Sequence, residues 1–190
     1  DQGQIGFGRE VTVTASLLAG LFVTVPTPRV LAESIWVLHW NDEFNGSGGV
    51  SNADWIYDTG ISYPGGPANW GTGEIEVMSS STANVFQSGG FLNIRALHTG
   101  SDPLTGWTSG RIETKRKDFQ PLTGQKMAIE ASIQLPNVTG SAAQGYWPAF
   151  WMLGAPYRGN YWNWPSVGEI DIMENINGTN TWIGTFHCGV

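Results

Sequence analysis

Apolar and polar residues alternate along several stretches of this chain, and this period of two restricts the possible fold more than any other feature. In residues 126–135 (KMAIEASIQL) every second residue from Met127 to Leu135 is apolar, and residues 91–97 and 109–117 alternate similarly. A half-buried β-strand has this period. No stretch after residue 32 keeps the apolar stripe of an amphipathic helix, so the sequence predicts strands here and an antiparallel all-β sandwich or barrel.

The composition limits the kind of partner. Of 190 residues, 13% are charged, ten are tryptophans, and the formal net charge is −7. The charged fraction is about half of the usual ~25%, which favours a partner that is polar but uncharged. The acidic balance would repel nucleic acid and other polyanions. We expect residues 139–146 and 154–166 to form long loops rich in Gly, Tyr, Trp and Asn, a kind that often carries function.

The first 32 residues differ from the rest. Residues 11–25 form an apolar run of the length found in secretory signal peptides, and Val30 and Ala32 suit a cleavage site after Ala32. A membrane anchor is the alternative, but the run is shorter than the ~20 residues that a transmembrane helix needs. We therefore expect a signal-like segment over residues 1–32, one folded domain over residues 33–190, and a secreted protein with no membrane partner after cleavage.

Three acidic residues crowd the stretch GEIDIMENI (168–176). In a regular strand Glu169 and Asp171 share one face, while Glu174 falls on the other face by parity. A β-bulge around Ile172–Met173 would return Glu174 to the face of the other two acids. Such a cluster suits cleavage of a glycosidic bond with retention, which needs a carboxylate nucleophile and a carboxylic acid about 5 to 5.5 Å apart. The middle Asp would raise the pKa of one glutamate, so that this glutamate stays protonated near neutral pH.

A calcium-binding edge or a merely solvated acidic edge is the alternative interpretation of these acids. Calcium loops place their acids on turns with glycine, whereas apolar residues separate the acids here. Acids that are forced together usually mark a functional site. The pattern therefore favours a catalytic strand.

The segment GEIDIMENING (168–178) is similar to the signature of glycoside hydrolase family 16, in the bulged form with two residues between Asp and the second Glu. Other segments resemble the family in the same order along the chain, and the likeness is greatest to the endo-β-1,3-glucanases called laminarinases. These segments are HWNDEFNG (39–46), NWGTGEIEV (69–77), TSGRIETK (108–115), GYWPAFWMLG (145–154) and GTFHCG (184–189).

The resemblance implies a β-jelly-roll sandwich whose concave face forms a sugar-binding cleft. It also implies a secreted, endo-acting and retaining β-glucan hydrolase that cuts β-1,3 or mixed β-1,3-1,4 bonds of a neutral polysaccharide. Glu169 would be the nucleophile, Glu174 the general acid and base, and Asp171 the residue that tunes and orients the nucleophile. Catalysis of this kind would need no cofactor.

Six further residues are substrate-binding candidates by the same resemblance. Trp164 is expected in a cleft loop, whereas core packing is the rival interpretation for Trp147 and Trp151. Arg111 could equally be a solvated strand-edge residue, and His187 a structural histidine. Asn45 completes the set. Glu43 lies where the family often holds a structural calcium, but the sequence assigns no metal ligand.

Other functions are compatible with the same scaffold. A non-catalytic β-glucan-binding or recognition protein typically lacks the glutamates, which are present here. The bulged spacing argues against licheninases and xyloglucan transglycosylases, although another neutral polysaccharide remains an alternative substrate. Enzymes acting on agar and carrageenan carry the same bulged motif, but sulfated galactans need basic clefts.

The length predicts an incomplete fold. All-β sandwiches commonly run to 200 to 250 residues, and residues 33–190 fall short of this size. We expect the closing strands to be missing at the C-terminal side. A C-terminal segment or a second chain would then be needed to complete the fold.

Overall fold

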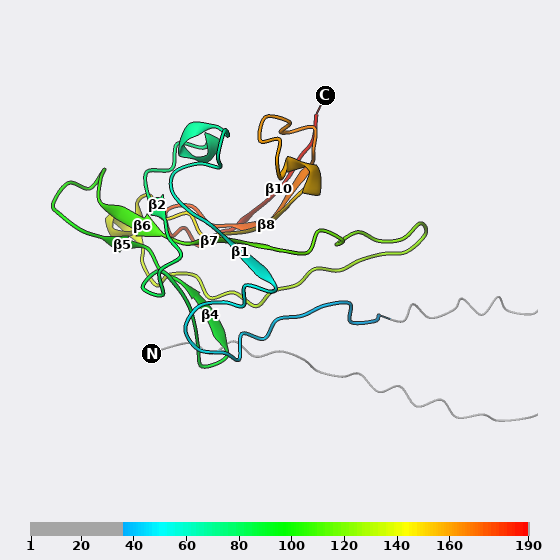
Figure 1. Ribbon diagram of the computed structural model, residues 1–190. Helices are drawn as coiled ribbons and strands as arrows, with labels where there is room; N and C mark the ends of the chain where they lie inside the picture. Colours follow the sequence, from blue (N-terminus) through cyan, green and yellow to red (C-terminus); the bar gives the residue numbers. More distant parts are fainter. Residues whose placement is uncertain (1–35, 190) are drawn as a thin grey trace, which may run out of the picture.

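The computed structural model describes residues 36–189, and β-strands dominate this part of the chain (Figure 1). The strands are β1 (Trp55–Asp58), β2 (Val77–Met78), β3 (Val85–Ser88), β4 (Phe91–Ile94), β5 (Leu97–His98), β6 (Trp107–Ser109), β7 (Arg111–Thr114), β8 (Ala149–Leu153), β9 (Glu169–Glu174) and β10 (Ile183–His187). The helices of the described residues are short 3-10 turns, η1 (Ala68–Gly71), η2 (Gly140–Ala143) and η3 (Ala155–Tyr157). The expected all-β class is confirmed.

The signal-like segment predicted over residues 1–32 lies outside the described residues. Among the residues that the structure describes, no helix is long and apolar enough to cross a membrane.

The sheet that carries the acidic stretch has the strand order β10-β9-β8, and both outer strands run antiparallel to β9. The remaining strands pair as β1 with β7, β3 with β4, and β2 and β5 on either side of β6. In Figure 1 the three strands of the first sheet curve together and are drawn in orange and red. The isoleucines of β9 favour an extended backbone, and its central place in the sheet holds the acids between two neighbours.

A small core lies around the hairpin β3-β4. Val85 is fully buried, and Gly110 keeps the space beside it, since a Cβ atom there would lie 2.1 Å from Val85 Cγ2. The buried side-chain amide of Asn84 donates hydrogen bonds to Arg95 O at 2.9 Å and to Thr108 Oγ1 at 3.1 Å. Because a buried amide needs partners, these bonds fix the hairpin against β6.

The prediction of a strand over residues 126–135 is wrong. The structure has no strand between β7 and β8, and the segment runs alongside residues 115–125 as a long projection (Figure 1). Met127 and Ile129 are half-buried, whereas Ile133 is 42% exposed. The alternation is real, but a strand also needs an edge that accepts its backbone hydrogen bonds, and none of the described strands pairs with this segment.

The face of β9 opposite its acids is apolar and only partly buried. Ile170 is 42% exposed. Together with Ile172 it lines an apolar groove of about 380 Å³, and the rest of the lining comes from Met152 of β8 and from residues of the segment 119–129. The groove lies between this segment and the sheet, so the described residues cover this apolar face only in part.

Candidate active site

The strand β9 contains the predicted bulge. On β8, Phe150 pairs with Met173 and the next residue, Trp151, pairs with Asp171, so Ile172 is an extra residue in β9. The register with β10 shifts at the same place. One inserted residue reverses the side-chain parity of the later residues in the strand, which brings the acid after the bulge to the face of the two acids before it.

Glu169 is half-buried at the start of β9. Its Oε2 accepts a hydrogen bond from Trp164 Nε1 at 2.5 Å. Burial raises the pKa of the Glu169 carboxyl, and the negative charge of Asp171 raises it further, while the Trp164 hydrogen bond and the nearby His187 lower it. The sequence predicted that the central Asp would raise the pKa of the glutamate that stays protonated; the raised pKa here belongs instead to Glu169, the residue expected to be the nucleophile, and burial is its main cause.

Asp171 is buried at the centre of the strand, with 6% of its surface exposed. Its Oδ2 lies 3.1 Å from Nε2 of His187, which belongs to β10 and pairs with Glu169 in the sheet register. The ring of His187 also lies 5.5 Å from the ring of Trp164. His187 is therefore in contact with the acidic cluster, and this contact fits both a residue of the site and a structural histidine.

Glu174 ends β9 and is also held by a tryptophan. Its Oε1 accepts a hydrogen bond from Trp147 Nε1 at 2.8 Å. Trp147 is 46% exposed and Trp164 49% exposed, so neither ring belongs to a core. Core packing is therefore the wrong interpretation for Trp147. Both glutamates thus accept a hydrogen bond from an exposed indole ring.

Arg111 packs against Trp151 of this sheet and is not a solvated strand-edge residue. Its side chain is 18% exposed, and its guanidinium carbon lies 4.8 Å from the ring centre of Trp151 and 4.6 Å from that of Trp70. It forms ion pairs with Asp58 at 3.5 Å and Glu74 at 3.8 Å. Trp151, which pairs with Asp171 in β9, therefore rests on a buried cation and contacts it by a cation–π interaction.

Sequence patterns did not point to the acids that surround Arg111. Asp58 is 7% exposed and accepts a hydrogen bond from Tyr63 Oη at 3.1 Å. Burial raises the pKa of Asp58 to about 6, with a further increase from the charge of Glu113 and a partial decrease from Arg111. A buried arginine requires counter-charges, and this requirement is the one signal that could have pointed to such residues.

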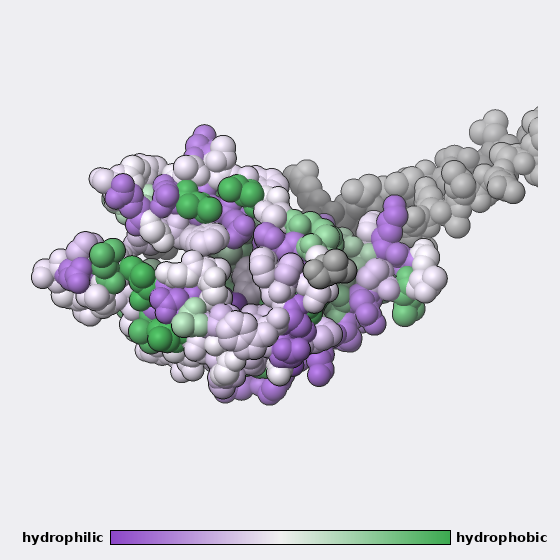
Figure 2. Space-filling view, turned by 90° about the horizontal axis from the view of Figure 1, so that it is seen from above, coloured by the Kyte–Doolittle hydropathy of each residue, from purple (hydrophilic) through white to green (hydrophobic). Residues whose placement is uncertain are grey.

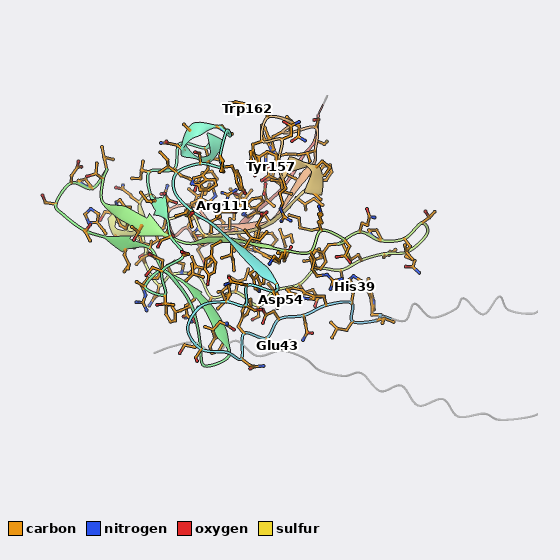
Figure 3. The ribbon with its side chains drawn as sticks, viewed as in Figure 1. His39, Glu43, Asp54, Arg111, Tyr157 and Trp162 are labelled. Atoms are coloured by element: carbon orange, nitrogen blue, oxygen red, sulfur yellow. The ribbon has the colours of Figure 1, made fainter. Side chains whose placement is uncertain are left out.

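An aromatic group continues the site on the side of Arg111. The rings of Tyr63 and Tyr161 stack at 4.3 Å, and Tyr157 packs edge-on against both. Figure 3 shows Arg111 in the middle of the molecule, with Tyr157 nearby and Trp162 farther out. Viewed from above, the surface of the molecule is mainly hydrophilic or weakly polar, and hydrophobic side chains form separate groups (Figure 2).

Two predicted residues lie elsewhere. Asn45 is exposed, and its Oδ1 would lie 3.7 Å from a Cβ atom placed on Gly90, at the turn between β3 and β4. The hydrogen bonds of the described residues do not connect Asn45 with the three acids. Glu43 is exposed and accepts a hydrogen bond from Asn41 Nδ2 at 3.0 Å. Within residues 36–189, no group of three His, Cys, Asp or Glu side chains is arranged to hold a metal ion.

Residues 135–190 match the sequence model for the XgeA-like catalytic domain of glycoside hydrolase family 16. The chain is 35% identical over 178 residues to the glucan endo-1,3-beta-glucosidase A1 of Niallia circulans, covering 88% of this chain and 24% of that protein. It is 34% identical over 164 residues to the glucan endo-1,3-beta-glucosidase of Cryptopygus antarcticus, covering 83% of this chain and 53% of that protein.

The fold is similar to the crystal structure of an endo-1,3-beta-glucanase from Streptomyces sioyaensis. The TM-score is 0.70 at 54% sequence identity, over 78% of this chain and 54% of that chain. The chain thus spans about a quarter of the first relative and about half of the other two. The chain is thus similar to endo-1,3-beta-glucanases in sequence and fold, and residues 135–190 are similar to the catalytic domain of glycoside hydrolase family 16.

Proposed function

We propose that this chain belongs to a retaining endo-β-1,3-glucanase in which Glu169 is the nucleophile and Glu174 the general acid and base. One observation carries the proposal: β9 is bulged at Ile172, and the glutamates on either side of the bulge each accept a hydrogen bond from an indole N–H. The comparisons support it, because relatives with this fold are named endo-1,3-β-glucanases.

The reaction has two steps. In the first step a carboxylate oxygen of Glu169 bonds to the anomeric carbon while the glycosidic bond breaks, and Glu174 gives its proton to the leaving oxygen. In the second step Glu174 takes a proton from water, the water oxygen bonds to the anomeric carbon, and Glu169 is released. Configuration is retained because the carbon is displaced twice.

Asp171 and His187 support the nucleophile in this proposal. The negative charge of Asp171 lies close enough to raise the pKa of Glu169, whereas His187 lowers it. The short contact between Asp171 and His187, 3.1 Å, fixes both side chains across β9 and β10. We assign them the role of orienting Glu169 and balancing its charge.

The proposed substrate is a neutral β-glucan. The formal net charge of −7 disfavours anionic polysaccharides. Exposed tryptophans beside the acids, Trp147 and Trp164, offer ring faces suited to sugar rings. The apolar run at residues 11–25 supports secretion, which would place the protein where such polysaccharides occur.

The test is the release of reducing ends from laminarin by the full-length gene product, with Glu169→Gln as the paired variant. We expect laminarin hydrolysis by the wild-type protein and its loss in the variant. A folded wild-type protein that binds laminarin without cleaving it would overturn the hydrolase assignment and favour a β-glucan recognition protein. A protein that neither binds nor cleaves laminarin would overturn the choice of substrate.

A further inference from the structure

Trp147 lies in a segment that is fixed on both sides. Ala149 of β8 pairs with Glu174 in the sheet register. Before the start of β8, Pro148 O accepts a hydrogen bond from Asn175 N at 3.1 Å, and Tyr146 O accepts one from Asn177 N at 2.9 Å. The backbone before β8 therefore continues alongside the chain after Glu174, and Trp147 has little freedom to move relative to this acid.

The chain after Glu174 is fixed as well. Asn175 is 3% exposed, and its side-chain amide donates hydrogen bonds to Thr179 O at 2.8 Å and Thr181 O at 2.7 Å. Buried amides with satisfied hydrogen bonds keep the backbone rigid. The two partners of the Trp147–Glu174 hydrogen bond are thus attached to backbone segments that are bonded to each other, and the second segment is also held by the Asn175 amide.

An indole N–H can only donate a hydrogen bond, whereas the two oxygens of a protonated carboxyl differ. The oxygen that carries the proton is the donor, and the other oxygen is the better acceptor. Because Trp147 Nε1 donates to Oε1 of Glu174, it favours the form of the neutral acid whose proton is on Oε2. Among the described residues, no side chain or backbone group donates a hydrogen bond to Oε2.

We propose that Trp147 is a positioning residue for Glu174. Its indole N–H group keeps Oε1 of Glu174 as a hydrogen-bond acceptor, so Oε2 is the oxygen that carries and transfers the proton. This inference rests on the proposed glucanase function. In the first step the proton moves from Oε2 to the glycosidic oxygen as that bond breaks, and in the second step Oε2 takes a proton from the attacking water. Trp147 itself exchanges no proton.

The alternative is that the Trp147 ring only stacks on the sugar or supports the loop. Trp147→Phe separates the two roles, since it keeps an aromatic ring and removes the N–H group. Trp162→Phe is the matched control, because the Trp162 indole is 71% exposed and donates its hydrogen bond to a backbone atom, Gly65 O, at 2.8 Å.

The experiment compares two substrates with the full-length protein. Laminarin has a poor leaving group that needs a proton from the acid, whereas 2,4-dinitrophenyl β-laminaribioside has a leaving group that departs without one. General acid catalysis contributes typically 10² to 10⁴-fold, so we expect Trp147→Phe to lower kcat/KM for laminarin by roughly 10 to 100-fold. For the dinitrophenyl substrate kcat/KM should change by less than about 3-fold, since that bond breaks without general acid assistance.

Equal losses on both substrates would overturn the proposal and favour stacking or loop support, as would an unchanged kcat/KM for laminarin. If Trp147→Phe fails to fold, benzothienylalanine at position 147 keeps the bicyclic ring and lacks only the N–H group, and the same two outcomes apply. Glu174→Gln gives the upper limit of the leaving-group effect. Failure of the proposed function is distinguishable, because the wild-type protein would then cleave neither substrate.

Discussion

The two faces of β9 differ more than any two other parts of this molecule. On one face, each acid has a partner from another segment of the chain: Trp164 for Glu169, His187 for Asp171 and Trp147 for Glu174. On the opposite face, Ile170 and Ile172 line an open apolar groove. Polar groups on a strand can be satisfied by single side chains from nearby loops, whereas apolar groups are buried only when a whole layer packs over them.

The two faces should therefore differ in their effect on both the rate of the reaction and the stability of the protein. The polar face should control the rate of the reaction, and the charged groups around Arg111, which contacts Trp151 of the neighbouring strand, should give stability a dependence on pH. The open apolar face should contribute little to either. Four substitutions test this contrast.

Glu169→Gln should have the largest effect and should act on the rate alone. We expect kcat for laminarin to fall by roughly 10³-fold or more, since the nucleophile is lost. The free energy of unfolding should stay the same or rise, because burial disfavours the charged form of Glu169 and Gln removes that charge. Activity assays and urea denaturation of both proteins measure this, and a clear loss of stability in Glu169→Gln would contradict the prediction.

Arg111→Leu should have the largest effect on stability. It would leave Asp58 and Glu74 without their buried cation, and breaking a buried ion pair costs about 3–5 kcal/mol. The cost should be smaller at pH 5 than at pH 7.5, since Asp58 is then mostly protonated. Denaturation at both pH values measures the effect. Arg111→Lys is the control that keeps the charge, and a cost independent of pH would show that Asp58 is not the main partner.

Asp58→Asn should reveal the pH dependence directly. The pKa of Asp58 is raised from 3.8 to about 6 in the folded protein. Between these values the unfolded chain has lost the proton while the folded protein keeps it, so the wild-type protein loses stability as the pH rises. Relative to the wild type, the variant should therefore gain about 3 kcal/mol between pH 3.5 and pH 7. A constant difference over this range would disprove the raised pKa.

Ile170→Ser should have the smallest effect. Ile170 is 42% exposed on the open face, and substitutions at exposed positions usually change stability by less than about 1 kcal/mol. Val85→Ala in the buried hairpin provides the comparison and should cost about 2 kcal/mol. If Ile170→Ser lowers the free energy of unfolding of the full-length protein as much as Val85→Ala does, another layer of the full-length protein covers this face.

Much of the site was predictable because its signal is local. The spacing of Glu169, Asp171 and Glu174 required a bulge at Ile172–Met173, and the structure has one there. Trp164 was expected near the acids and donates to Glu169. The partners of the acids were harder to predict from the sequence. The contact between Asp171 and His187 depends on the register between β9 and β10, and the sequence of a single strand does not determine that register.

The sequence by itself determined the all-β class and the acidic strand, because side-chain parity along a strand follows from the backbone and needs no neighbour. Only the tertiary structure decided which strands pair. Residues 126–135 have a good strand pattern and form no strand, and Arg111 lies in a predicted strand yet became a buried cation between aromatic rings. Strand pairing and the burial of charge are properties of contacts between distant segments, and local alternation does not encode them.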